Sequence, residues 1–238
     1  MFKQLRKALG LSPEPAAQLG VVTPGQLAQW AGAQRWAFAF DGEPDRFVLQ
    51  GQVVEHSCRL ESGAPSRDYM QGTELRVRAE LALNPDAHVM VISRALKEEL
   101  EGRVYGAITN SLQTTVDQSL PQEMRWLSIY EEMRWPQLPA SFVRAFAVVG
   151  EDLDTARHWV NAALVSQLMR DQQQAPPGQA PLVLMVSDAS VSLRMQSSGR
   201  YLPDLEYAMG AFLAACVVAT HQLPPTVDDH GPSTLPVT

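Results

Sequence analysis

Residues 208–220 read Ala-Met-Gly-Ala-Phe-Leu-Ala-Ala-Cys-Val-Val-Ala-Thr, and no side chain in this run carries a charge. The run is shorter than the roughly 20 apolar residues that a membrane span needs. A helix that is apolar on every side belongs in a protein interior. We therefore predict that this segment is the central helix of a folded core, and that the rest of the chain covers it.

The strands that would cover this helix are predicted from two patterns. Directly before it, the apolar runs Leu182 to Val186 and Val191 to Met195 flank Ser187-Asp188-Ala189-Ser190, which indicates a β-hairpin. Earlier, Glu74 to Leu81 alternates strictly between apolar and charged residues. Such alternation is typical of a half-buried antiparallel strand with a charged outer face.

Capping residues and apolar alternation predict where the elements of the amino-terminal half begin and end. Thr23, Pro24 and Gln26 form a capping box that begins a helix, and a strand is expected to end at Phe40. Between Phe47 and Leu60 the apolar residues change parity, which predicts a β-bulge near Gly51 to Val54.

Four further elements follow the alternating strand. A short strand at Val89 to Ile92 leads into a helix from Arg94 to about Gln113, where close packing of a neighbour would explain Gly102 and Gly106. Met124 to Tyr130 fits both helix and strand, and we favour strand. Another strand is expected at Phe142 to Val149, and one helix, capped by Asp152 or Asp154, is expected to run to about Met169.

These elements predict an α+β fold, a mainly antiparallel sheet with helices packed on one face. Residues 21–223 would form this domain, either as a whole or as two similar-sized halves, about 21–118 and 119–223. Residues 1–20 would be an amphipathic helix and a connector, and residues 224–238 a disordered tail.

Composition restricts the compartment and the partners. The formal charge of −7 disfavours general binding to nucleic acid, which requires a positive field. The two cysteines, Cys58 and Cys216, are expected as buried free thiols in a reducing cytoplasm, with a disulfide as the alternative. Abundant arginine and alanine with little lysine suggest a bacterial source. Residues 1–11 contain no secretory signal; their apolar face would dock on the core or, as the alternative, touch a membrane peripherally.

Motifs for catalysis and cofactors are missing. The histidines, His56, His88, His158, His221 and His230, lack the spacing of a zinc site, so no metal is expected. The sequence contains no Gly-x-Ser-x-Gly motif of serine hydrolases. It also contains no Gly-x-Gly-x-x-Gly motif of dinucleotide-binding proteins and no P-loop motif, so no cofactor is expected. One catalytic alternative is left: His56 and Cys58 share a strand face, and an imidazole beside a thiol can create a nucleophile.

The strand-rich region supplies a candidate surface for a ligand or partner. Guanidinium groups suit carboxylate or phosphate ligands, and four arginines could line one sheet face: Arg59, Arg67, Arg76 and Arg78. Glu55, Glu61, Glu74 and Glu80 lie in the same strands, so cross-strand ion pairs are the competing explanation. Trp126 and Trp135, each preceded by arginine, are either interface anchors or core residues.

The carboxyl-terminal half also resembles a known group of domains. A Phe-Val-Arg-Ala-Phe-Ala-Val-Val-Gly strand leads to an aspartate-capped helix with a tryptophan, then to the hairpin and the long apolar helix. Residues 142–221 thus resemble bacterial domains of unknown function built on a strand–helix–hairpin–helix plan. The resemblance implies an α+β fold and no particular activity or site. Some members carry preceding transmembrane segments, and none is expected in this chain.

Two functions from different classes follow from these observations. The favoured hypothesis is a non-catalytic protein-interaction or adaptor domain with a protein partner in the bacterial cytoplasm. The alternative is a small hydrolase or thiol enzyme that uses Cys58 with His56.

Overall fold

The computed structural model describes residues 23–40, 42–43, 46–110, 120–170, 180–197 and 202–225. The expectations for residues 1–20, for the peripheral membrane contact of residues 1–11 and for nearly all of the tail lie outside this part of the chain. The described helices are α2 (Pro24–Ala33), α3 (Arg94–Asn110), α4 (Gln122–Ile129), α5 (Ala140–Ala145), α6 (Leu153–Trp159), α7 (Ala162–Leu168) and α8 (Leu202–Gln222). The described strands are β1 (Ala37–Phe40), β2 (Phe47–Val53), β3 (His56–Gly63), β4 (Thr73–Glu80), β5 (Val89–Ser93), β6 (Glu132–Met133), β7 (Phe146–Gly150), β8 (Leu182–Ser187) and β9 (Ser190–Ser197).

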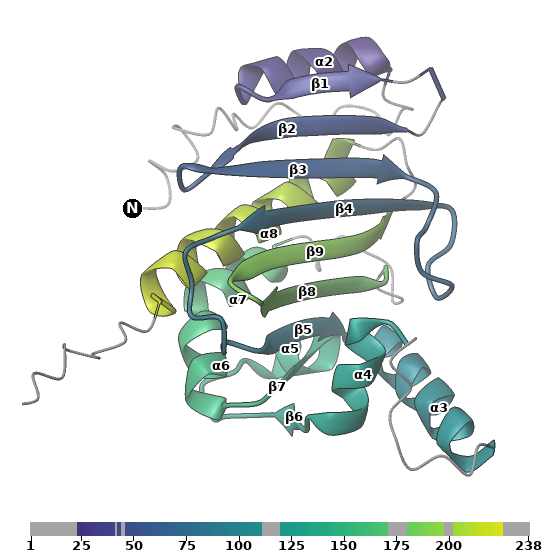
Figure 1. Cartoon of the computed structure of the whole chain (residues 1–238), viewed down its shortest axis with the longest axis vertical. Helices are drawn as coiled ribbons and strands as arrows, with labels where there is room; N and C mark the ends of the chain where they lie inside the picture. Colours follow the sequence, from purple (N-terminus) through teal and green to yellow (C-terminus); the bar gives the residue numbers. More distant parts are fainter. Residues whose placement is uncertain are drawn as a thin grey trace, which may run out of the picture.

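The nine strands form one antiparallel sheet in the order β1-β2-β3-β4-β9-β8-β5-β7-β6 (Figure 1). The β8–β9 hairpin therefore lies between β4 and β5, which are consecutive in the sequence. Strands from both halves of residues 21–223 pair within this sheet. The predicted α+β class with an antiparallel sheet is confirmed.

Helix α8 packs behind the sheet and forms the centre of the larger core (Figure 1). Ala208, Phe212, Ala215 and Cys216 have no exposed surface, as expected for a central helix, whereas Val217 on the outer side is 37% exposed. By length and composition alone α8 could cross a membrane. Its burial against the sheet, α6 and α7 explains the apolar composition as that of a core helix.

The opposite face of the sheet is covered over only part of its width. There, α3 and α4 pack on β5, β7 and β8 and form a second core around Met90, Ile92, Leu100 and Trp126. The expectation of helices on one face therefore holds only for the part of the sheet formed by β2, β3, β4 and β9. Over β3, β4 and β9 this opposite face carries polar side chains.

Four predicted local features are corrected by the structure. The expected bulge near Gly51 to Val54 is a two-residue hairpin turn, in which Val54 and Glu55 have φ of 47° and 67°. The expected strand over Met124 to Tyr130 is helix α4, and the strand expected from Phe142 begins only at Phe146, after α5. The single helix expected up to Met169 is broken after Val160, because Asn161 begins α7 as its N-cap.

Candidate functional site

The polar part of the sheet face contains a cavity of about 350 Å³. Its floor consists of side chains from β3, β4, β8 and β9, and the amino-terminal end of α4 supplies Gln122 and Glu123 as a wall. Alternation along the strands produces this floor. Arg76 and Arg78 lie on the face away from α8, whereas Leu75, Val77 and Ala79 are buried in the larger core on the α8 side of the sheet. In Figure 1, α8 lies behind the sheet, so the face opposite α8 is turned toward the viewer.

Arg59 of β3 and Arg78 of β4 lie directly opposite each other on the cavity floor. Each is held by a glutamate two residues along its own strand: Arg59 Nε donates to Glu61 at 2.6 Å, and Arg78 Nε donates to Glu80 at 2.7 Å. Their Nη atoms have no partner among the described residues, and both side chains are about half exposed. Two arginines at directly opposed positions thus offer their terminal donors to a ligand.

A second opposed pair, Arg76 of β4 and Arg194 of β9, surrounds a buried carboxylate. Glu74 has no exposed surface and accepts hydrogen bonds from Arg194 Nη1 at 2.6 Å and from the amide and hydroxyl of Ser66. Arg76 bridges Glu74 and Glu61. This pair is therefore largely neutralised within the protein.

Arg67 joins the site from the β3–β4 loop, residues 64–72. Its Nε lies 2.5 Å from Glu123, which is buried at the start of α4 and also accepts a hydrogen bond from the Tyr69 hydroxyl. Burial alone would raise the pKa of Glu123, but the hydrogen bonds from Arg67 and Tyr69 outweigh it and lower the pKa. Glu123 therefore stays ionised and fastens the loop to the cavity wall.

The cavity also has an apolar side. In the row Arg59, Arg78, Ser192, Met185 across β3, β4, β9 and β8, the small Ser192 separates the arginines from Met185. Val183 and Met185 line the cavity beside α4. Val183 is 1% and Met185 5% exposed, so these residues add only a small apolar area to the guanidinium donors of the site.

The structure brings together all four arginines predicted as a surface. Of the glutamates expected as their partners, Glu61, Glu74 and Glu80 form ion pairs, while Glu55 lies in the β2–β3 turn. Sequence reasoning missed Arg194 and Glu123. Alternation along β9 could have found Arg194, but Glu123 directly precedes a segment predicted as strand, so no pattern pointed to its role.

The tryptophans lie elsewhere. Trp126 is 6% exposed in the second core, where its ring packs edge-on against His88 and Tyr130. Trp135 is 9% exposed and belongs to the larger core. Both occupy core positions, so neither presents the open ring of an interface anchor.

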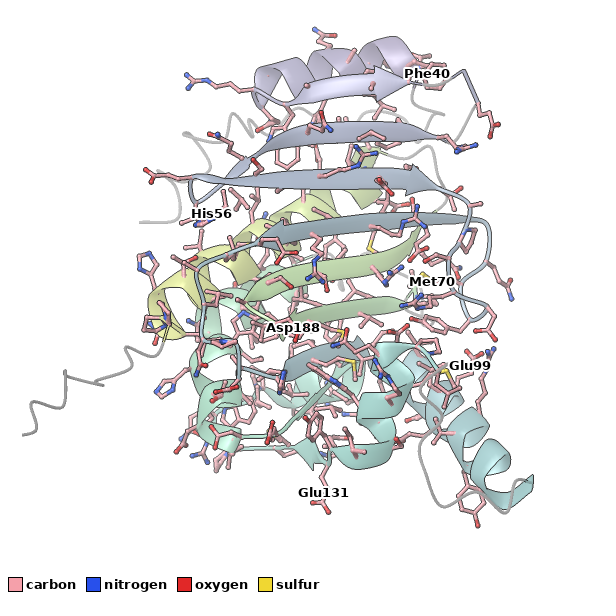
Figure 2. All side chains as sticks on the ribbon, viewed as in Figure 1. Phe40, His56, Met70, Glu99, Glu131 and Asp188 are labelled. Atoms are coloured by element: carbon pink, nitrogen blue, oxygen red, sulfur yellow. The ribbon has the colours of Figure 1, made fainter. Side chains whose placement is uncertain are left out.

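His56 and Cys58 do not form an activated thiol. Cys58 lies in the core below the sheet, and burial raises the pKa of its thiol to about 12. Burial also raises the pKa of Cys216, and the nearby Cys58 adds to this shift. Figure 2 places His56 at the start of β3, at the edge of the molecule. Both cysteines carry free thiols, and no group of three or more potential metal ligands occurs among the described residues.

Comparisons with known proteins add a likeness in fold. No protein-family model and no curated protein matches the chain. The fold is similar to the crystal structure of the mycobacterial trehalose monomycolate transport factor A, with a TM-score of 0.46 and 10% sequence identity over 86% of this chain and 97% of that chain. At this identity and score the likeness carries no function over to this chain.

Proposed function

We propose that this protein is a non-catalytic interaction or adaptor domain of the bacterial cytoplasm, and that it binds a partner protein through the arginine-lined face of the sheet. The observation that carries the proposal is the pair Arg59 and Arg78. Like charges directly opposite each other destabilise a sheet unless something compensates them. Glu61 and Glu80 compensate the two charges through the Nε atoms, and the Nη donors that are left suit a surface that meets an anionic partner.

The burial of Cys58 supports a binding function over the thiol enzyme. A thiol with a pKa of about 12 is protonated near neutral pH, whereas a nucleophilic cysteine needs its thiolate. The free, buried state of both cysteines also supports a reducing compartment.

Affinity capture from a native bacterial extract tests the proposal. Three full-length proteins are compared: the wild type, an Arg59→Gln/Arg78→Gln variant, and a control with Arg144→Gln/Arg157→Gln. The control removes the same charge from exposed sites on α5 and α6. We expect a protein recovered at near-stoichiometric level with the wild type and the control, and at least about tenfold less with the Arg59→Gln/Arg78→Gln variant.

Two results contradict the proposal. Recovery of no partner by the wild type argues against an adaptor. Equal recovery by all three proteins shows that the partner binds away from this face. Circular dichroism of each protein checks that the substitutions leave the fold intact.

A further inference from the structure

We infer that the cavity binds a peptide carboxylate: an aspartate or glutamate of the partner lies between the forks of Arg59 and Arg78, and a neighbouring side chain of the same peptide enters the space over Ser192. This inference rests on the proposed function and specifies the part of the partner that enters the cavity.

The geometry of the two arginines favours an oxyanion. Because Nε of each is occupied by its own glutamate, the two Nη atoms of each guanidinium are the donors that a ligand can use. A carboxylate between them can accept hydrogen bonds from both groups and reduces their mutual repulsion. Arg76, Arg67 and Arg194 use donors on Glu61, Glu123 and Glu74, so they are less available.

The charge of the surrounding face favours a carboxylate over a phosphate. Five arginines, Arg59, Arg67, Arg76, Arg78 and Arg194, are nearly balanced by Glu61, Glu74, Glu80 and Glu123. A face with so small an excess of positive charge matches a singly charged carboxylate. A phosphate of charge about −1.5 to −2 would leave negative charge uncompensated beside four glutamates.

The shape of the cavity leaves room for a second side chain of the peptide beside its acid. A volume of about 350 Å³ is larger than a carboxylate needs, and beyond Ser192 it reaches Val183 and Met185. Ser192 leaves this room because its side chain is small where Arg78 and Met185 flank it in the same row. Val183 and Met185 are only 1% and 5% exposed, so a side chain placed there mainly fills the space over Ser192 and adds little apolar contact.

Fluorescence anisotropy with the full-length protein at low salt tests the inference. The probe is the fluorescein-labelled, carboxyl-amidated peptide Gly-Ser-Leu-Glu-Leu-Ser-Gly, and matched peptides carry glutamine or phosphoserine in place of glutamate. We expect the glutamate peptide to bind, and the glutamine peptide to bind at least about tenfold more weakly. The phosphoserine peptide is expected to bind no more tightly than the glutamate peptide.

Protein variants locate the site. We expect Arg59→Gln/Arg78→Gln to weaken the glutamate peptide at least about tenfold. Arg78→Lys, which keeps the charge but loses the fork, is expected to weaken it several-fold. Ser192→Leu fills the space over this position without changing any charge and is expected to weaken it as well, while Arg144→Gln/Arg157→Gln leaves the affinity unchanged.

Each failure has a separate meaning. Tighter binding of the phosphoserine peptide overturns the carboxylate assignment, and unchanged affinity of the Arg59→Gln/Arg78→Gln variant overturns the site. If no peptide binds, yet the captured protein is still lost with that variant, the inference falls and the proposed function stands. If the captured protein is retained by that variant, the proposed function itself falls.

Discussion

The carboxylate of Glu132 is surrounded by three cationic side chains, which is more than surround any carboxylate of the cavity. Arg94 binds it bidentately, with Nη1 and Nη2 at 2.7 and 3.0 Å from its two oxygens, and Lys97 and Arg134 lie at 3.3 and 2.7 Å. Arg94 also donates to the carbonyl oxygens of Val143 and Phe146. This cluster ties α3, β6 and the α5–β7 junction together.

Acid should weaken this cluster. Burial alone would raise the pKa of Glu132, but hydrogen bonds from Arg94 and Arg134 lower it from 4.5 to about 2. A lowered pKa stabilises the fold above about pH 4.5, and that contribution is lost as the pH falls toward 2. We expect Glu132→Gln to lower the free energy of unfolding by about 1–3 kcal/mol at pH 7, and by less at pH 3.

Urea denaturation at both pH values measures this difference. The exposed neighbour Glu131, which points away from the molecule in Figure 2, provides the control Glu131→Gln with little effect at either pH. An equal loss for Glu132→Gln at both pH values would contradict the electrostatic explanation.

Two glycines should respond to alanine in opposite directions. A Cβ at Gly102, in α3, would meet no atom within 4 Å, so close packing does not explain this glycine. A Cβ at Gly150, in β7, would lie 2.6 Å from the carbonyl oxygen of His88. We expect Gly102→Ala to raise the free energy of unfolding by up to about 1 kcal/mol and Gly150→Ala to lower it by about 1–3 kcal/mol. Thermal denaturation distinguishes the two signs. A higher melting temperature for Gly150→Ala would show that the backbones of β5 and β7 can move apart at little cost.

The thiols of Cys58 and Cys216 should be inert in the native protein. Burial raises the pKa of both, so few thiolates form near neutral pH and reagent cannot reach them. We expect iodoacetamide to label neither residue until urea unfolds the chain, as measured by mass spectrometry of peptides. Rapid labelling of Cys58 in the native protein would contradict this expectation and support the thiol-enzyme hypothesis.

At the scale of elements, the sequence predicts the helices and strands whose residue pattern fits only one type of secondary structure. The capping box of α2, the alternation of β4 and the apolar flanks of the β8–β9 hairpin all have such patterns, and these elements form as expected. Helix α4 does not, because Met124, Trp126 and Tyr130 suit a strand face as well as they suit a helix that covers β5. Only the tertiary contact with the sheet decides between them.

The turn between β2 and β3 was missed for a related reason. Its positive-φ residues are Val54 and Glu55, whereas glycine or asparagine normally marks such a turn.

The cavity could be predicted from the sequence only in part. Strand alternation groups Arg59, Arg76 and Arg78, but the wall from α4 depends on a helix that the sequence did not specify.

The loop of residues 64–72 should depend on Glu123. This buried carboxylate accepts hydrogen bonds from Arg67 and Tyr69 and is their link to α4. We expect Glu123→Ala to lower the free energy of unfolding by about 2–4 kcal/mol, because breaking a buried ion pair leaves its partner uncompensated.

Hydrogen exchange provides the local measurement. The amides of residues 64–72 should exchange faster in Glu123→Ala, while those of β2 keep their protection. Uniform acceleration over the whole sheet would show a global loss of stability instead of release of the loop.

At the scale of the molecule, one sheet and one helix should make unfolding a single event. Pairing of β4 with β9 and of β5 with β8 joins both halves of the chain, and α8 packs against elements from each. We therefore expect tryptophan fluorescence and far-ultraviolet circular dichroism to give the same urea midpoint. Two separate transitions would show that the halves unfold independently.

The depth of α8 can be tested with two of its own residues. Phe212 is fully buried, so Phe212→Ala should lower the free energy of unfolding by about 3–5 kcal/mol. Val217 is 37% exposed, so Val217→Ala should cost less than about 1 kcal/mol. Similar losses for both variants would place α8 differently from the structure in Figure 1.

The position of β8 and β9 between β4 and β5 has a consequence for synthesis on the ribosome. Until residue 197 has left the exit tunnel, the inner edges of β4 and β5 have no strand to pair with. An unpaired edge is a template for aggregation, and such distant pairing slows folding. A nascent chain of this protein must therefore wait for its last hairpin before the sheet can close, which makes that interval a natural point for chaperone binding.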